Sequence, residues 1–259
     1  MGKSGKTVLT DGELRTHWRA GLAEYCVEEG TVVTPAAQDF LREHGMTLRF
    51  RGAAGPYRSM TVTPIPVKDG KVIFQDARTG EMTAQKGEGM THLRANLLVP
   101  KTHPRIEFRG KLDSLMARFI GAQVLASEAG KDALCRDLGE LLDYVRIILA
   151  GEVKDETLPE MHLLGLDSRG IRRASHQVKE TLGIDHPIPD YRMGRICAAL
   201  NELRTAVREA ELAAARAFLS EDGSGTRMDI IEGMNRLSSC VYILFCREAA
   251  HFYDRETKR

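Results

Sequence analysis

Residues 133–150, ALCRDLGELLDYVRIILA, decide the fold class of this chain. The large apolar residues of this stretch recur every three or four positions, at Leu134, Leu138, Leu141, Leu142, Val145 and Leu149. This spacing places them on one face of an α-helix. The stretch therefore predicts a long amphipathic helix whose apolar face packs against other helices.

Four further segments show the same helical period. They span residues 105–127, a shorter stretch after Ser168, residues 193–219, and a last stretch that begins at Asp229. Glu232 follows Asp229 by three positions, a pattern that predicts a capping box at the start of the last helix. Five helices joined by loops of medium length are typical of a helical bundle. We therefore expect a mainly α protein built on a five-helix bundle.

The first 90 residues differ from the rest because glycine and proline interrupt them repeatedly. We expect a helix from Asp11 to Glu28, with Leu14, Trp18, Leu22 and Tyr25 on one face. A short strand is expected at residues 31–33.

The segments that follow are also short. Thr34 and Pro35 predict the start of a helix that runs to about Glu43, and residues 46–50 predict a strand. Residues 51–90 are expected to form loops with weak strands, such as residues 72–74. The sequence thus predicts a small α/β N-terminal segment over residues 1–90 and a helical-bundle domain over residues 91–259.

Composition excludes some classes of partner. The chain has 259 residues and a formal net charge of +1, so no global field favours nucleic acid or a membrane surface. Its five cysteines show no metal-ligand or redox spacing, which indicates a reducing, cytoplasmic compartment without disulfides. No apolar run reaches membrane-spanning length. Residues 1–10 are polar and basic, so we expect no secretory signal.

A carboxylate interrupts an apolar stripe in the helix expected at residues 105–127. Asp113 shares a face with Met116, Ala117, Ile120 and Val124 by helical spacing. A buried carboxylate needs a charged or hydrogen-bonding partner. The alternative is that Asp113 lies at a frayed helix end and stays in contact with water.

Three charged residues share one face of the helix expected at residues 193–219. Arg204, Arg208 and Glu211 follow one another at steps of four and three. They form either a solvated ladder of ion pairs or an anion site in which the glutamate orients the guanidinium groups. The planar arginine side chain suits phosphate oxygens.

Further polar residues add to this pattern. Asn235 and Arg236 interrupt the apolar run of the last helix, where either both point outward or the asparagine makes a specific hydrogen bond. Lys101 and Arg105 supply positive charge before the first long helix. Together these residues indicate a helical bundle with clustered basic groups suited to a polyphosphate.

Several separated blocks of the sequence resemble the ethanolamine-utilisation cobalamin adenosyltransferases. They keep the family's order and cover most of residues 30–245. The blocks are Met90–Leu93, Val99–Ile106, Gly110–Ser114, Gly165–Leu166, Arg173, Ser175–Gln177, Gly194–Arg195, Leu203–Thr205, Val207–Glu209, Glu211 and Asn235–Ser239, with Thr34–Ala36 and Phe40–Leu41 near the N-terminus.

This family is similar to the propanediol-utilisation adenosyltransferases, and that likeness implies a five-helix bundle that forms a homotrimer with interfacial active sites. It implies that Asp113 pairs with Arg204 across the subunit interface. It also implies that Arg208, Glu211 and Asn235 contact ATP, that Lys101 is another ATP-binding residue, and that Arg105 and Arg236 bind the substrates beside them.

The sequence departs from the family in four ways. Residues 51–100 contain no cysteine and only His92, so the histidine–cysteine metal site of ethanolamine-type relatives cannot be built here. The glycine-rich ATP loop of the propanediol type is absent, and Thr91–Lys101 is expected to replace it. Ser239 stands where those relatives carry an acidic residue. The phenylalanine under their corrin ring aligns with His186 or is supplied elsewhere, with Tyr191 as a further candidate.

The resemblance implies alkyl transfer. Reduced cobalamin attacks the 5′ carbon of ATP, triphosphate leaves, and Mg²⁺ accompanies the nucleotide. A reduced flavoprotein as electron donor, an adenosylcobalamin-dependent ammonia-lyase as recipient, and a cytoplasmic location with microcompartment association are implied as well. The alternatives are a non-catalytic cobalamin or ATP carrier or sensor, a structural bundle, and an adenosyltransferase that serves another cobalamin enzyme.

Overall fold

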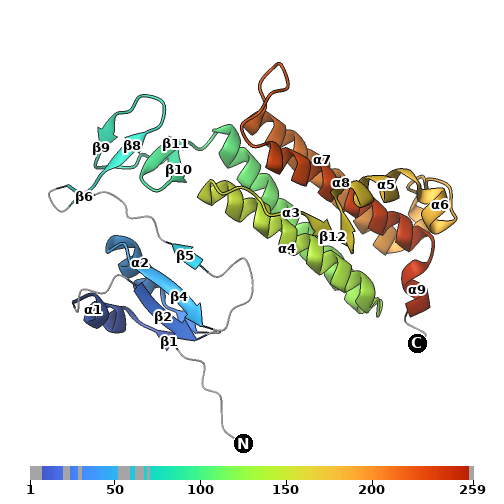
Figure 1. The fold of residues 1–259 in the computed structure, drawn as a ribbon, viewed down its shortest axis with the longest axis horizontal. Coiled ribbons are helices and arrows are strands. Elements are labelled where there is room, and N and C mark those ends of the chain that lie inside the picture. The colour runs from blue at the N-terminus through green and yellow to red at the C-terminus, as the bar shows by residue number, and fades with distance from the viewer. Residues whose placement is uncertain are drawn as a thin grey trace, which may run out of the picture. The chain divides into compact units, whose positions relative to one another are not determined.

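The computed structural model of this chain describes residues 8–19, 24–28, 31–51, 59–61, 67–68 and 71–256. The chain divides into two compact units, Met1–Lys101 and Thr102–Arg259. The boundary expected at residue 90 falls inside the first unit, at the start of strand β10 (Met90–Arg94). This strand pairs antiparallel with β11 (Leu97–Pro100), so the two strands stay with the unit that precedes them (Figure 1).

The N-terminal part of the first unit is a small α/β structure. Its helices are α1 (Asp11–Arg19) and α2 (Pro35–Glu43), and its strands are β1 (Val8–Leu9), β2 (Glu24–Glu28), β3 (Val32–Val33), β4 (Thr47–Arg51) and β5 (Ser59–Thr61). β1 pairs with β3, and β4 lies between β2 and β5. The helix predicted after Thr34 is confirmed, and the Thr34 hydroxyl caps it by accepting from the Ala37 N–H at 3.3 Å. The strands predicted at residues 31–33 and 46–50 are confirmed as β3 and β4.

The helix expected from Asp11 to Glu28 is wrong in its second half. The helix ends at Arg19, and Glu24–Glu28 forms β2, which pairs in parallel with β4. The expected helical face does not hold, because Leu14 is buried whereas Trp18 is 45% exposed, and Leu22 lies outside the described residues. Pairing with a strand twenty residues later overrides the local helical pattern, as tertiary context commonly does.

The second part of this unit is a sheet with strand order β10–β11–β8–β9. The remaining strands are β6 (Val67–Lys68), β7 (Lys71–Val72), β8 (Phe74–Asp76) and β9 (Met82–Thr83). The single strand expected at residues 72–74 is therefore two strands separated at Ile73. β6 and β7 form their own antiparallel pair.

The second unit is a helical bundle, which confirms the mainly α prediction. Its long helices α3, α4, α7 and α8 pack around one apolar core, and α5 lies against α8 (Figure 1). All five expected helices form, with short additions: α3 (Pro104–Glu128), α4 (Asp132–Lys154), α5 (Ser168–His176), α6 (Val178–Leu182), the 3₁₀ turn η1 (Tyr191–Met193), α7 (Gly194–Phe218), α8 (Met228–Ala249) and α9 (Phe252–Glu256). The strands β12 (His162–Leu163) and β13 (Leu166–Asp167) form a hairpin before α5. In the part of the chain that the structure describes, no helix has the length and apolarity needed to span a membrane.

Helix α3 buries a different face from the one marked by Asp113. The buried residues are Phe108, Leu112, Leu115, Phe119, Ala122 and Ala126. Asp113 is exposed, Ile120 is 49% exposed and Val124 is 51% exposed. The helix carries apolar residues on two sides, and the side with the two phenylalanines fills the core. Asp113 lies in the body of the helix and not at a frayed end, but its exposure confirms the part of the alternative that keeps it in contact with water.

The capping box expected at the start of α8 does not form. The N-cap residue is Arg227, without a side-chain cap bond. Asp229 instead accepts a hydrogen bond from the Leu158 N–H at 3.0 Å, and Glu232 accepts one from the Ser168 hydroxyl at 2.6 Å. Both carboxylates therefore tie α8 to other segments of the unit.

Candidate active site

The outward face of α7 carries the first group of predicted site residues. The opposite face packs into the core through residues that include Leu200, Leu203, Val207, Ala210 and Ala214. Arg208 is exposed and Glu211 is half-buried, and neither makes an ion pair with another side chain in the described ranges. A guanidinium group in this state keeps its hydrogen-bond donors free for a ligand.

Arg204 lies one turn before Arg208 and is half-buried. Its Nε and one terminal nitrogen donate to the Asn201 Oδ1, at 3.3 and 3.0 Å. An amide oxygen orients the guanidinium group but leaves its charge uncompensated. Within a single chain, Arg204 therefore has a positioning partner, and no carboxylate is bonded to it among the described residues.

Helix α8 contributes Asn235, Arg236 and Tyr242. Asn235 is exposed, whereas Arg236 is half-buried and donates from Nε to the Ser168 hydroxyl on α5 at 3.0 Å. Arg204 lies close enough to Tyr242 to act on its pKa. Helices α7 and α8 pack side by side and run antiparallel (Figure 1).

An aromatic cluster lies where the loop after α6 meets α8. The His186 Nδ1 and the Tyr242 hydroxyl are 2.6 Å apart, and the two rings are stacked with centroids at 6.0 Å. Tyr242 also stacks on Phe245 at 6.4 Å. Burial raises the pKa of Tyr242 to about 12, so this hydroxyl stays protonated at neutral pH. The cluster therefore consists of stacked flat rings, with one hydrogen bond between His186 and Tyr242.

A pocket of ≈ 220 Å³ adjoins this cluster. Its lining includes Tyr191, Asn201 and Phe245. Tyr191 is 86% exposed, and its ring lies 5.9 Å from the guanidinium carbon of Arg192. Asn201 therefore connects the aromatic pocket to Arg204, because the same side chain lines the pocket and holds the guanidinium group.

Two further predicted site residues are Asp113, on α3, and Lys101, the last residue of the first unit. Asp113 has no bonded partner among the described residues, and it makes no contact with Arg204 within the chain. Ion pairs from α3 to α7 form nearby, Lys111 with Glu209 at 3.0 Å and Arg118 with Glu202 at 3.4 Å. Lys101 is exposed at the end of the first unit, where its N–H donates to the Gly89 carbonyl at 2.9 Å.

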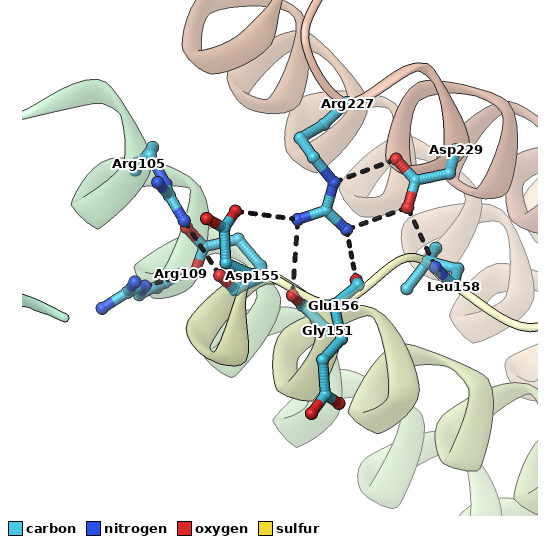
Figure 2. A network of polar contacts seen from close by, with 9 residues as sticks. Arg105, Arg109, Gly151, Asp155, Glu156, Leu158, Arg227 and Asp229 are labelled. Carbon is cyan, nitrogen blue, oxygen red and sulfur yellow. Dashed lines mark hydrogen bonds and ion pairs between the residues drawn. The ribbon is translucent and has the colours of Figure 1, made fainter. Parts of the chain in front are cut away.

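Arg105 belongs to a different kind of cluster. Arg105 and Arg109 both donate to the carboxylate of Glu152, whose side chain is fully buried at the end of α4 (Figure 2). Arg105 also donates to the Glu152 carbonyl at 2.9 Å. Two hydrogen bonds from the Arg105 guanidinium group are therefore made inside the protein.

Arg227 continues this cluster toward α8. It donates to the Asp229 carboxylate at 2.8 Å, to the Gly151 carbonyl at 3.3 Å and to the Glu156 carbonyl at 2.8 Å (Figure 2). Burial opposes ionisation of Asp229, but the hydrogen bonds from Arg227 and Leu158 lower its pKa overall. The network joins the start of α3, the end of α4 and the start of α8, which gives it a structural role.

Sequence reasoning did not single out Glu152, Asn201 or Tyr242. A signal existed for Glu152, because it follows Leu149 by three positions and so continues the apolar stripe of α4. Asn201 and Tyr242 carry no comparable signal, since each lies at an ordinary position of its helix and gains its role from a contact with another residue.

Comparison with known proteins identifies the family. The family model described as cobalamin adenosyltransferase matches residues 82–248. The chain belongs to the cobalamin adenosyltransferase family. It is 35% identical over 166 residues to the corrinoid adenosyltransferase EutT of Salmonella typhimurium, a match that covers 64% of this chain and 61% of that protein. It is 29% identical over 247 residues to the corrinoid adenosyltransferase EutT of Escherichia coli, covering 92% of this chain and 91% of that protein.

The sequence-based prediction of an ethanolamine-type corrinoid adenosyltransferase is thereby confirmed. The family match in this adenosyltransferase runs from β9 to the end of α8, so it includes Lys101 and every predicted site residue of the bundle. It leaves out most of the first unit and α9.

The buried cysteines of this adenosyltransferase are not reactive groups. Burial raises the pKa of Cys240 to about 12 and the pKa of Cys197 and Cys246 to about 11. These thiols therefore stay protonated at neutral pH and pack as small apolar side chains.

Proposed function

We propose that this chain transfers the 5′-deoxyadenosyl group of ATP to reduced cobalamin at a site on α7 and α8. The observation that carries the proposal is the free, exposed guanidinium group of Arg208, between Arg204 and Glu211, in a chain of the adenosyltransferase family. The leaving group of this reaction is triphosphate, which needs fixed positive charge as the bond breaks.

The reaction breaks the bond between the 5′ carbon and oxygen of ATP, and its electron pair leaves with triphosphate. The cobalt of cob(I)alamin supplies the pair that forms the cobalt–carbon bond. Arg208 and Lys101 would bind the phosphates, with Glu211 and Asn235 orienting the nucleotide and Arg236 held beside them by Ser168. Mg²⁺ would arrive on the phosphates, because no group of three acidic, histidine or cysteine residues that could hold a metal occurs in the described residues.

The aromatic cluster is the proposed site for the lower face of cobalamin. Reduction of cob(II)alamin becomes easier when cobalt loses its lower ligand, and flat or apolar groups can occupy that position in place of a ligand. His186, Tyr242 and Phe245 are stacked beside the pocket that Tyr191 and Asn201 line. Since Asn201 also holds Arg204, the proposed cobalamin and phosphate sites share one positioning residue.

The outer face of α3, formed by Asp113, Ala117, Ile120 and Val124, supports a homotrimer with interfacial sites. Two large apolar side chains on this face are about half exposed, and Asp113 lacks a partner in the described part of its own chain. In the same described ranges, no carboxylate is bonded to Arg204. An Asp113–Arg204 pair between copies would satisfy both charges and bring α3 of one copy to α7 of the next.

We also propose that the product serves an ethanolamine ammonia-lyase, that a reduced flavoprotein supplies the electron, and that the protein works in the cytoplasm in association with a microcompartment. The ethanolamine link follows the name of the EutT relatives. The electron donor, the cytoplasmic location and the microcompartment rest on the family resemblance alone. They add no contact to the site described above.

The test is an anaerobic assay with ATP, Mg²⁺ and chemically reduced cob(I)alamin, followed by the visible spectrum as the cobalt–carbon bond forms. Arg208→Ala should lower kcat/KM by about 100-fold, because it removes a donor to the leaving group. Arg136→Ala removes an exposed arginine from the outer face of α4 and should leave kcat/KM unchanged. Binding of cobalamin without product in the wild-type protein would favour the carrier or sensor function instead.

A further inference from the structure

A second pocket lies beside the start of α8. It has a volume of ≈ 480 Å³ and is bounded by α4, the segment after α4, the start of α5 and the start of α8. Its floor includes Tyr144, Leu158, Met161 and Gly233. Ser168, which holds Arg236 in the proposed ATP site, lines this pocket, but none of the residues proposed to contact ATP or cobalamin does.

The hydroxyl of Tyr144 is the first sign of a ligand. The Tyr144 side chain is buried, with 5% of its surface exposed, yet its hydroxyl has no hydrogen-bond partner among the residues that the structure describes. A Cβ atom at Gly233 would lie 2.8 Å from this oxygen. No fully buried polar side-chain atom of the described residues lacks a partner, so this oxygen is open to the pocket beside Gly233, where a bound group can take the place of water.

The lining of this pocket is acidic. It contains Glu160, Asp167, Asp229 and Glu232 against Arg169. Asp229 is paired with Arg227, as described above, which leaves three carboxylates. Asp167 uses one oxygen to accept from the Gly170 N–H, and Glu232 uses one to accept from the Ser168 hydroxyl, so each keeps a second oxygen for a ligand.

Two arginines lie near these carboxylates, but neither is bonded to Asp167 or Glu232. Arg236 donates to the Ser168 hydroxyl, which in turn donates to Glu232, so the guanidinium group is separated from this carboxylate by the serine. Arg169 is exposed. Burial raises the pKa of the Tyr144 hydroxyl, and the charges of Glu232 and Asp229 raise it further. The carboxylates of Glu232 and Asp229 lie close enough to act on this hydroxyl, whose oxygen can accept a hydrogen bond from a cation.

We propose that this pocket binds a small organic cation with one or two ammonium groups. The ammonium hydrogens would bond to Asp167, Glu232 and the Tyr144 oxygen, and the carbon chain would pack on Leu158 and Met161. A polyphosphate is repelled by the carboxylates. A divalent metal is disfavoured because the described residues contain no three-ligand group.

The experiment is isothermal titration of the full chain with butane-1,4-diamine at fixed ionic strength and without ATP, with butane-1,4-diol as the neutral molecule of the same shape. The diamine should bind at one site and the diol should not. Tyr144→Phe and Glu232→Gln should each weaken binding by about tenfold, the effect of one charge-assisted hydrogen bond. Glu221→Gln, in the exposed loop between α7 and α8, is the matched control and should bind as the wild type does.

Two results would overturn the proposal. Equal binding of the diamine and the diol would remove the role of charge, and equal binding by Tyr144→Phe, Glu232→Gln and Glu221→Gln would place the diamine elsewhere. Displacement of the diamine by equimolar Mg²⁺ would also overturn it, because the site would then be one for metal. Arg208→Ala should keep full diamine binding, so failure of the proposed adenosyl transfer and failure of this site are distinguishable.

Discussion

The arginines at the junction of α3, α4 and α8 have carboxylate and carbonyl acceptors, whereas Arg204 and Arg208 on α7 have no carboxylate partner among the described residues. Arg105, Arg109 and Arg227 donate to Glu152, Asp229 and backbone carbonyls. Arg204 has an amide partner, and Arg208 is free of bonded partners in the described residues. The same residue type thus stabilises the fold in one region and is left for a ligand in the other.

The largest effect on the difference between these two groups of arginines is expected from a change at Glu152. Glu152→Ala should lower the free energy of unfolding by about 3 kcal/mol or more, because it leaves two partly buried guanidinium groups unpaired. Urea unfolding of the full chain measures this. Glu211→Ala is the counterpart on α7 and should change stability by less than about 0.5 kcal/mol. Similar losses for the two variants would contradict the division into a structural and a ligand-binding region.

The next largest effect is expected at the proposed subunit interface. Asp113→Arg should weaken the assembly by about 2 kcal/mol or more per interface, since it places like charges together. Light scattering with size-exclusion chromatography reports the mass. The double variant Asp113→Arg with Arg204→Asp should restore the assembly. An unchanged mass for the single variant would remove Asp113 from the interface.

A smaller effect is expected at the aromatic cluster. His186→Ala should slow product formation several-fold when the reaction starts from cob(II)alamin and a reductant, because reduction depends on the lower face of the corrin. It should have less effect when cob(I)alamin is supplied. Both rates come from the visible spectrum, and His162→Ala, an exposed histidine on β12, is the control. Equal slowing in the two assays would argue against a role in reduction.

The smallest effect is a pH dependence at His103. This residue caps α3 by accepting from the Arg105 N–H at 3.2 Å, which requires a neutral nitrogen. Burial lowers the pKa of His103, and the charges of Arg105 and Arg109 lower it further. The unfolded chain therefore binds the proton more readily, and stability should fall as the pH drops below about 6.5, by up to about 1 kcal/mol. In His103→Ser, which caps without titrating, urea unfolding between pH 5 and 8 should lose this slope.

Local signals predicted the elements that depend on neighbours in sequence. Thr34 and Pro35 mark the start of α2, and the apolar stripe of residues 133–150 marks α4, because capping and helical periodicity involve residues three or four apart. The helix expected to reach Glu28 ended early because Glu24–Glu28 pairs with Thr47–Arg51, and a local pattern holds no information about that strand.

The candidate site was also only partly predictable, because local patterns carry no information about residues far away in the chain. Charge spacing and family resemblance selected Arg204, Arg208, Glu211 and Asn235, which lie on the neighbouring helices α7 and α8. Arg105 was selected as a positive charge before the first long helix, whereas Arg208 was selected from helical spacing and the family resemblance. Glu152 distinguishes them, and it lies 47 residues from Arg105.

The sequence by itself determined the family, the helical bundle and the set of charged residues on α7 and α8, because these follow from residue identity, order and periodicity. The tertiary structure decided which apolar face of α3 is buried, which arginines are neutralised, and where Tyr144 keeps a free hydroxyl. Burial and pairing depend on residues far apart in the chain, so they exist only once the helices have packed.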